Sequence, residues 1–386
     1  MLQNRISNSF FKSLEKIENG SLNFISPEGK SYIFGNSKNK EPIKFKLNNW
    51  QAIKKLIYKG DVGFAEIYQD GSIETEDLTS LLNLCLKNEE ILNKYIFGSK
   101  FQSLANRLKY LLKLNSLKGS KKNILAHYDL GNNFYKLWLD KSLTYSAAIY
   151  KNSNDSLELA QKNKYQNILA QLPKKSGRIL EIGCGWGGFA EAALNSGSYD
   201  IKAITLSEEQ HKFAKSRLNN KAEICLEDYR IQKSKYDYII SIEMFEAVGK
   251  KYWQTYFSKI KELLNQSGKA IIQTITIDEK YFKKYNKSGD LIRSFIFPGG
   301  MLPTENLFTQ AARKSGLECK TPYYFGQDYA KTLREWLINF QNKQAEIKKL
   351  GFDNSFIKLW ELYLASCIAG FESQRINVMQ IELNHA

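Results

Sequence analysis

A glycine-rich turn is the first stretch of the chain whose residues could do chemistry. Gly183, Gly185 and Gly188 follow the spacing G-x-G-x-x-G within LEIGCGWGG. Glycines at this spacing let the backbone at the start of a helix approach a ligand closely, either a pyrophosphate or another group beside a ribose. Two details disfavour a dinucleotide: Trp186 would crowd a pyrophosphate, and the next predicted strand ends in TLS (205–207), without the acidic residue that binds the ribose.

Alternating strands and helices must position this turn. Apolar segments typical of strands lie at 178–182, 200–206, 236–242 and 269–277. Helical periodicity lies between them, for example at 156–171 and 207–218. This alternation predicts a mostly parallel sheet with helices on both faces, whose ligands bind at the carboxyl ends of the strands.

The chain ahead of this region divides into two further parts. Residues 1–95 predict a small α+β domain, because SLNFISPEGKSYIFG places two alternating segments around a Pro-Glu-Gly turn and DLTSLLNLCLKN has helical periodicity. Residues 96–122 predict a basic helix that either links the domains or lies in a membrane interface. Residues 123–386 then form the domain with the glycine turn.

Composition narrows the function classes. The 386 residues carry a formal charge of +16, which favours polyanionic partners such as anionic lipid. The alternative is that these charges only form a solvated, lysine-rich surface. No nucleic-acid motif is present, so we expect no nucleic-acid partner. Five scattered cysteines and three histidines provide neither a disulfide framework nor a metal site. With no signal-like or membrane-spanning apolar run, we expect a cytoplasmic protein.

The turn L-E-I-G-C-G-W-G resembles the first motif of S-adenosylmethionine-dependent methyltransferases. Further blocks, in order, resemble cyclopropane-fatty-acyl-phospholipid synthases and related fatty-acid methyltransferases, and GDVGFAEIYQDG (60–71) resembles the small domain in front of the bacterial members. The blocks are HYDLGNNFYKLWLD (127–140), LTYSAAIY (143–150), ITLSEEQ (204–210), EDYR (227–230), SIEMFEAVG (241–249), FIFPGGMLP (295–303) and DYAKTLREW (328–336). The resemblance implies an α/β fold: a seven-stranded Rossmann-like class I methyltransferase domain, with a small N-terminal α+β domain and helical lid insertions.

The resemblance also implies a cofactor site for S-adenosylmethionine. Hydroxyl and amide groups suit the ribose, adenine and carboxylate of this cofactor, and aromatic faces suit its sulfonium. For Tyr128 and Tyr145, ordinary aromatic packing is the alternative role. The implied cofactor residues are Tyr128, Tyr145, Ser146, Glu181, Gly183, Gly185, Trp186, Gly187, Thr205, Leu206, Gln210, Asp228 and Tyr229.

The implied reaction adds a methylene group to the cis double bond of an unsaturated phospholipid acyl chain. It passes through a carbocation that a bound bicarbonate deprotonates. The positions that match the family's bicarbonate ligands are Glu246, Gln273, Tyr329 and the backbones of Ile275 and Ala147. Because two bare anions repel in a dry site, we expect Glu246 to share a proton with the bicarbonate or to be offset by donors.

Two of these positions depart from the pattern of the well-known synthases. Ala147 stands where those enzymes have cysteine, and Gln273 where many have histidine. These changes leave open a second product, a methyl or methylene branch in place of the ring. Cys367, in contrast, agrees with the family pattern, because it matches a cysteine regarded as an active-site residue. Packing on an apolar helix is its alternative role.

The segment SGDLIRSFIFPGGMLPT (288–304) predicts a lid and part of an acyl tunnel, lined by Phe295, Ile296 and Phe297, or else a core-packing loop. Two other functions stay open: a small-molecule N-methyltransferase and a catalytically silent lipid-binding protein. Plant alkaloid N-methyltransferases generally lack the N-terminal domain, which favours the lipid enzymes. We further expect peripheral association with the inner, anionic face of the membrane and a possible homodimer.

Overall fold

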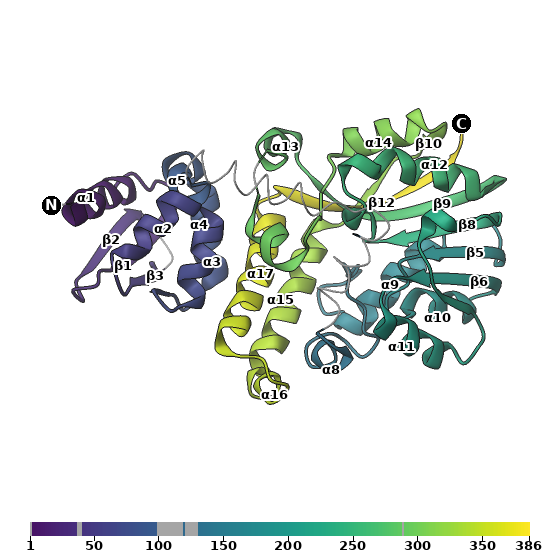
Figure 1. Ribbon diagram of the computed structural model, residues 1–386, viewed down its shortest axis with the longest axis horizontal. Helices are drawn as coiled ribbons and strands as arrows, with labels where there is room; N and C mark the ends of the chain where they lie inside the picture. The colour runs from purple at the N-terminus through teal and green to yellow at the C-terminus, as the bar shows by residue number, and fades with distance from the viewer. Residues whose placement is uncertain (1, 37–40, 99–118, 120–129, 288) are drawn as a thin grey trace.

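The computed structural model describes residues 2–36, 41–98, 119, 130–287 and 289–386. The chain forms two bodies, a small N-terminal domain and a larger one built around a long twisted sheet (Figure 1). Most of the predicted basic helix at 96–122 lies outside the described residues, and so does Tyr128.

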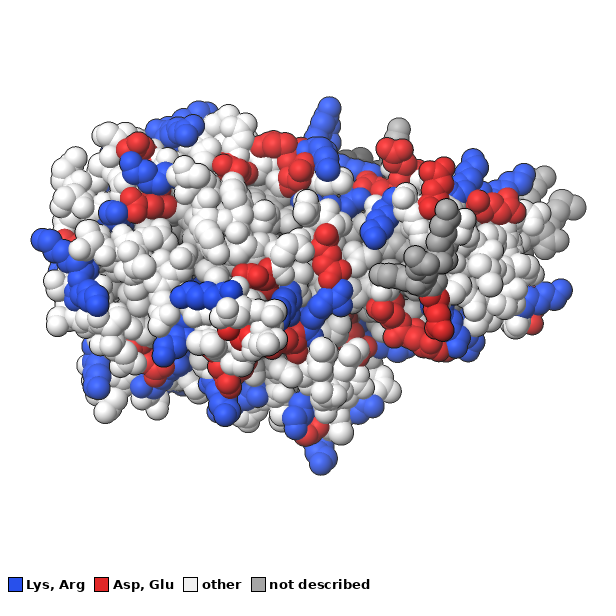
Figure 2. All heavy atoms as spheres, turned by 180° about the vertical axis from the view of Figure 1, so that it is seen from behind, with Lys and Arg blue, Asp and Glu red and all other residues white. Residues whose placement is uncertain are grey.

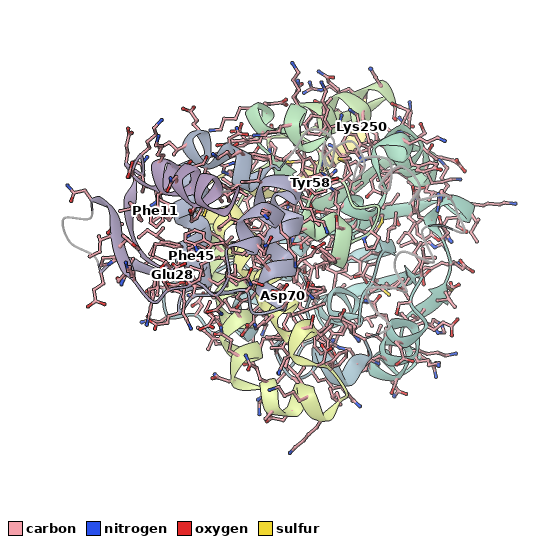
Figure 3. The ribbon with its side chains drawn as sticks, turned by 60° about the vertical axis from the view of Figure 1, so that its left-hand side comes forward. Phe11, Glu28, Phe45, Tyr58, Asp70 and Lys250 are labelled. Carbon is pink, nitrogen blue, oxygen red and sulfur yellow. The ribbon has the colours of Figure 1, made fainter. Side chains whose placement is uncertain are left out.

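The N-terminal domain is a four-stranded sheet covered by helices. The predicted hairpin is confirmed, because β1 and β2 pair antiparallel around the turn at Glu28, and the sheet order is β2-β1-β3-β4. Figure 3 shows Phe11 and Phe45 at this sheet, where they pack with Phe24 and Trp50 in an aromatic core. The elements are α1 (Leu2–Leu14), β1 (Gly20–Ile25), β2 (Ser31–Asn36), β3 (Ile43–Leu47), α2 (Gln51–Lys59), α3 (Asp61–Gln69), β4 (Ile73–Glu74), α4 (Leu78–Lys87) and α5 (Glu89–Ile96).

The large domain holds a sheet in the order β10-β12-β9-β8-β5-β6-β7, with the short β11 paired to β12. The five strands from β9 to β7 are parallel, and β12 and β10 are antiparallel additions at one edge. The predicted strands are confirmed. The strands are β5 (Ser176–Ile182), β6 (Ser198–Thr205), β7 (Glu223–Leu226), β8 (Tyr236–Ile242), β9 (Leu264–Ile277), β10 (Leu317–Cys319), β11 (Tyr323–Tyr324) and β12 (Ile376–His385).

Helices cover both faces of this sheet, as the alternation predicted. Near-continuous apolar runs in β5, β8 and β9 are buried from both sides, as is typical of a parallel sheet. On one face α12 and α14 contribute Phe257 and Phe308 to the core, and on the other α9 and α10 contribute Ile168 and Phe189. The helices are α8 (Asn132–Tyr135), α9 (Leu157–Leu169), α10 (Gly188–Leu194), α11 (Glu208–Leu218), α12 (Trp253–Leu263), α13 (Glu279–Tyr285) and α14 (Glu305–Lys314).

A helical pair joins the two domains. Helices α15 (Gly326–Asn342) and α17 (Asn354–Glu372), connected through α16 (Gln344–Lys349), pack side by side at the carboxyl end of the sheet. Helix α17 also packs on α3 and α4 of the N-terminal domain, and Asn83 donates to Glu372 at 2.7 Å across this contact. Among the described residues, no helix combines the length and apolarity needed to cross a bilayer.

Candidate active site

A cavity of about 630 Å³ opens at the carboxyl ends of the parallel strands. The turns after β5, β6 and β8 form its polar end, and the segment around Phe297 and helices α15 and α17 form its middle. From there it continues to α3, α4 and α5 of the N-terminal domain, where its lining is mostly apolar. One cavity therefore connects the glycine turn with the contact between the two domains.

The glycine turn after β5 has the geometry of a ligand site. Gly183 and Gly185 have φ values of +83° and +52°, a region that favours glycine. A Cβ on Gly185 would meet no atom within 4 Å, so open space lies beside its backbone. Both glycines line the cavity, whereas Gly187 does not line it and instead caps the N-terminus of α10 with φ +83°.

Glu181, the last acidic residue before this turn, is buried and lines the same end of the cavity. Burial raises the pKa of its carboxyl to about 8, so the group holds its proton at neutral pH. Its Oε2 atom has no hydrogen-bond partner among the described residues. A carboxyl group with an unsatisfied oxygen, in the lining next to the open space at Gly185, fits a polar ligand such as the ribose of S-adenosylmethionine.

The remaining predicted cofactor residues surround this end from neighbouring elements. The Thr205 hydroxyl donates to Gln210 Oε1 at 2.9 Å, and the Asp228 carboxylate is paired with Arg230 at 2.6 Å. The Trp186 indole donates to Asn132 at 2.7 Å. Except for Gly187 and the undescribed Tyr128, every predicted cofactor residue lines the cavity, namely Tyr145, Ser146, Glu181, Gly183, Gly185, Trp186, Thr205, Leu206, Gln210, Asp228 and Tyr229.

The cavity is also lined by a carboxyl group that the sequence analysis did not select. Glu243, in the turn after β8, accepts three hydrogen bonds. The Ala147 backbone N–H and Gln273 Nε2 donate to its Oε1 at 2.8 and 2.7 Å, and the Tyr329 hydroxyl donates to its Oε2 at 2.7 Å. Three of the donors that the resemblance assigns to bicarbonate therefore hold a side chain of the protein.

The backbone around Glu243 supports this placement. Its φ of +50° lies in the left-handed region, which costs a residue other than glycine about 1–2 kcal/mol. Its N–H donates to the Gln273 carbonyl at 2.8 Å, and the Gln273 side chain in turn accepts from Gln380 at 2.9 Å. Strain of this kind persists where surrounding contacts hold it, often at functional sites.

A fully buried lysine, Lys164, interacts electrostatically with this carboxylate. Lys164 donates to Ser146 Oγ at 2.6 Å and to Gln161 Oε1 at 2.9 Å. Burial lowers its pKa to about 7, against the charges of Glu243, Asp140 and Glu181, which raise it. The sequence offered no signal for Lys164, because its segment reads as an ordinary polar helix.

The predicted Glu246 lies three residues after Glu243 and has a different environment. Its Oε1 accepts from the Ile275 N–H at 2.5 Å and from the Thr274 hydroxyl at 3.0 Å, so the fourth predicted bicarbonate donor is also engaged. Burial, followed by the charge of Glu243, raises the pKa of Glu246 to about 8. Its Oε2 is enclosed and has no partner among the described residues. Glu246 is thus protonated at neutral pH.

The donor set consequently does not fit bicarbonate in this structure. All four donors named from the resemblance already hold the carboxyl groups of Glu243 and Glu246. A further anion would find no donor of this set available and would lie beside an existing negative charge, which is unfavourable in an enclosed site.

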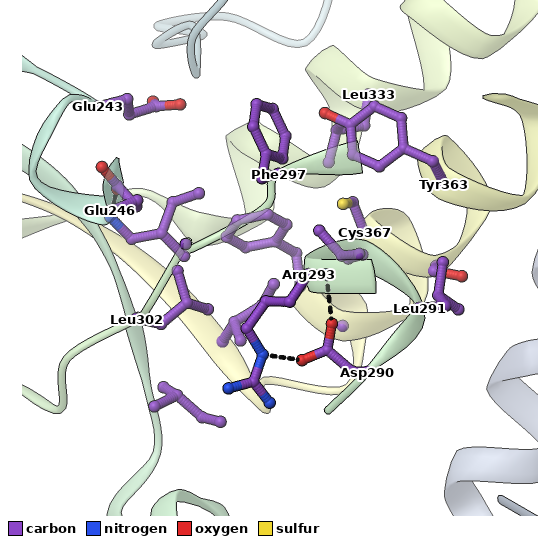
Figure 4. Close-up of a pocket in the computed structure, with 18 of the residues that line it drawn as sticks. Glu243, Glu246, Asp290, Leu291, Arg293, Phe297, Leu302, Leu333, Tyr363 and Cys367 are labelled. Atoms are coloured by element: carbon purple, nitrogen blue, oxygen red, sulfur yellow. Dashed lines mark hydrogen bonds and ion pairs between the residues drawn. The ribbon is translucent and has the colours of Figure 1, made fainter. Parts of the chain in front are cut away.

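Phe297 separates the two glutamates from Tyr363 and Cys367 in the view of Figure 4. Cys367 lines the cavity, and burial raises the pKa of its thiol, so it stays un-ionised. Of the three residues predicted to line a tunnel at 295–297, only Phe297 does so. A π-helical turn at Ile292–Ile296 leaves Phe295 exposed at the surface and packs Ile296 in the core.

Comparison with known proteins identifies the family. The family model "Mycolic acid cyclopropane synthetase" matches residues 115–381. The chain belongs to this family. Tuberculostearic acid methyltransferase UfaA1 of Mycobacterium tuberculosis is 32% identical over 85% of this chain and 79% of its own length. The cyclopropane-fatty-acyl-phospholipid synthase of Escherichia coli is 30% identical over 88% of this chain and 87% of its own length. Like its family, the protein is an S-adenosylmethionine-dependent methyltransferase.

Solved structures share the predicted fold. Mycolic acid cyclopropane synthase CmaA1, complexed with SAH and CTAB, matches with a TM-score of 0.64 and 27% identity over 68% of this chain and 97% of that chain. Coclaurine N-methyltransferase matches with a TM-score of 0.63 and 17% identity over 84% of this chain and 99% of that chain, which shows the fold alone.

Proposed function

We propose that this protein transfers a one-carbon unit from S-adenosylmethionine to the cis double bond of unsaturated phospholipid acyl chains and forms a cyclopropane ring. The observation that carries the proposal is the single cavity that runs from the glycine turn, past two carboxyl groups, to an apolar end. When bound, the cofactor supplies an electrophilic methyl group. The protein's residues must bind it, exclude water and accept a proton.

The apolar end of the cavity suits an acyl chain. Beyond Phe297 its lining includes Leu291 and Leu302 of the large domain and Phe64 and Leu82 of the N-terminal domain. Moving a methylene group from a bilayer into such a channel exchanges similar apolar contacts, so the transfer is nearly neutral in free energy. The N-terminal domain would thus form one wall of the acyl site.

Aromatic rings surround the place where positive charge would develop. The Phe297 ring lies 6.5 Å from the Tyr145 ring and 5.9 Å from the Tyr363 ring. Faces of aromatic rings attract cations, and this attraction is stronger in a site without water. These rings can stabilise a cationic carbon next to the carbon that receives the methyl group, until a base removes a proton.

The proposal does not include bicarbonate, because the donors expected to hold it are engaged by Glu243 and Glu246. It does include peripheral association with an anionic membrane, which would deliver the substrate. Lys and Arg side chains alternate with acidic ones on the face in Figure 2, so docking would draw on dispersed charges worth about 1 kcal/mol each near an anionic leaflet. A cytoplasmic location and a homodimer stay predictions.

A methyl- or methylene-branched product is the second candidate. It is favoured by the similarity to UfaA1, whose name describes a tuberculostearic acid methyltransferase. The same cation would give a branch if a hydride moved before the proton left. The ring and the methylene branch add the same mass, so mass alone cannot distinguish them.

The test uses purified protein, methyl-labelled S-adenosylmethionine and vesicles of unsaturated phospholipid containing anionic lipid. We expect label in the acyl chains, and NMR of the isolated fatty esters to show cyclopropane protons. Olefinic methylene or branch methyl signals would favour the second candidate. Cofactor binding without label in lipid would contradict both and favour the silent binder, and label in added small amines would favour an N-methyltransferase.

A further inference from the structure

We propose that Glu243 is the general base of this enzyme and replaces the bicarbonate that the family resemblance implies. This inference rests on the proposed function for its chemistry. Its structural part, which group occupies the anion site, can be tested independently.

The geometry of the donors carries the inference. The Ala147 N–H, Gln273 Nε2 and Tyr329 hydroxyl come from three elements far apart in the sequence, and all point at one carboxylate with distances of 2.7 to 2.8 Å. Such a convergence of donors is the usual description of an anion site. Here the anion is covalently attached to the protein, so it requires no binding from solution.

The backbone is shaped to deliver this side chain. Glu243 keeps a left-handed φ of +50°, where glycine would have no strain. The carboxylate brought there lines the cavity near Phe297, at the end of the acyl channel (Figure 4). A functional role of the Glu243 side chain would explain why this backbone strain is retained.

The two neighbouring carboxyl groups have different surroundings. Burial raises the pKa of Glu243, and the three donors, together with Lys164, act against that rise. Glu246 has donors on one oxygen only and is kept neutral by burial and by Glu243 itself. Of the two, Glu243 is the carboxyl group whose surrounding donors stabilise a negative charge on both oxygens, so it is the one placed to accept a proton.

The step balances without another reactant. The alkene electron pair forms a bond to the transferred methyl carbon as the bond from sulfur to that carbon breaks, which leaves a cation on the other alkene carbon. A Glu243 oxygen takes a proton from the new methyl group. The C–H electron pair then closes the third bond of the ring, and the Glu243 carboxyl holds the proton.

The test compares wild type with Glu243→Gln and Glu243→Gly. Glutamine keeps the site filled but cannot accept the proton, whereas glycine fits the backbone and leaves the three donors to an anion from solution. In buffer free of carbon dioxide we expect wild type to keep its rate of methyl transfer to lipid, and both variants to lose about 10²–10⁴-fold. Added bicarbonate should restore Glu243→Gly by at least about tenfold and leave Glu243→Gln inactive.

Binding provides a readout that needs no turnover. Titration with ¹³C-labelled bicarbonate, followed by NMR, should show binding to Glu243→Gly and none to wild type or Glu243→Gln. Calorimetric titration with S-adenosylmethionine verifies that each variant is folded. The inference is overturned if wild type binds bicarbonate as tightly as Glu243→Gly, or if its turnover requires bicarbonate. If wild type methylates no lipid, the proposed function fails, and the binding arm still decides what fills the site.

Discussion

The turns after β5 and β8 occupy equivalent positions in the sheet but contribute different chemical groups to the cavity. Both follow a buried parallel strand, both enter the cavity at the carboxyl edge of the sheet, and both contain a residue with positive φ, Gly183 and Glu243. The β5 turn contains glycines, so its contribution is the space beside its backbone, which a ligand can approach closely. The β8 turn has a glutamate at positive φ, where glycine would be unstrained, so its function comes from the donors that distant segments bring to that side chain.

The comparison also applies within the β8 turn. Glu243 and Glu246 are the same residue type, three positions apart, and both face one cavity. One is surrounded by donors to both oxygens, and the other has an oxygen with no partner among the described residues. Environment, and not residue type, therefore separates a proton acceptor from a neutral acid, as in other enzymes with paired carboxyl groups.

After the Glu243 variants, the largest effect is expected from Tyr329→Phe, which removes one distant donor of the β8 turn. A hydrogen bond to a charged group is worth about 1.5–3 kcal/mol, so we expect turnover to fall by about 10–100-fold. Affinity for S-adenosylmethionine, measured by calorimetry, should be retained. The matched control is Tyr150→Phe, which removes a hydroxyl bonded to the Glu335 carboxylate at 3.0 Å outside the cavity, and an equal loss there would contradict the role of Glu243.

A smaller effect is expected from Gly183→Ala in the β5 turn. The new Cβ would lie 2.9 Å from the Met244 side chain, in a backbone conformation that costs alanine about 1–2 kcal/mol. We expect a lower unfolding midpoint and weaker cofactor binding. Gly185→Ala is the control, because its Cβ meets no protein atom within 4 Å. It should weaken cofactor binding more than stability, and an unchanged affinity would contradict the assignment of this turn.

The pH dependence of stability should reveal the neutral state of Glu246. Its pKa is about 8 in the folded protein against 4.5 ordinarily, so the folded state holds a proton that the unfolded chain releases. This stability is present below pH 4.5 and is lost as the pH rises through 8. Between pH 5 and 8 the wild-type midpoint should therefore fall more than that of Glu246→Gln, by a few degrees, because a chain of 386 residues shifts by roughly 1 °C per kcal/mol.

Comparing the two proteins at each pH removes the contributions of Glu181 and Asp61, whose pKa values burial also raises. Glu243 and Tyr256 are the titratable groups that interact with Glu246. Parallel curves for wild type and Glu246→Gln would show that Glu246 is ionised in the folded protein.

The smallest effect is expected from Cys367→Ser. The thiol lines the cavity but stays un-ionised, so its contribution is apolar contact with the substrate channel. We expect a modest loss of turnover, measured with labelled cofactor and vesicles, and a larger effect on the apparent affinity for lipid. A loss of turnover as large as that of Tyr329→Phe would show that Cys367 takes part in the reaction and would contradict its role as an apolar contact.

Local pattern was sufficient for much of the molecule. Alternating apolar strands and amphipathic helices predicted the parallel sheet, and the glycine spacing predicted a turn with positive φ at Gly183 and Gly185, because strand period and positive φ are properties of a few adjacent residues. The tunnel prediction at 295–297 was only partly right. A π-helical turn changes which side chains face inward, and its effect on Phe295 and Ile296 is not visible in a 3.6-residue period.

The sequence by itself determined the fold class, the glycine turn at the edge of the cavity and the residue types that surround Glu243. Only the tertiary structure decided which glutamate those residues serve. Ala147, Gln273 and Tyr329 are separated by up to 182 positions and converge on Glu243 through the sheet and α15. A carboxyl group's role follows from its desolvation and its donors, which exist only after distant segments have packed together.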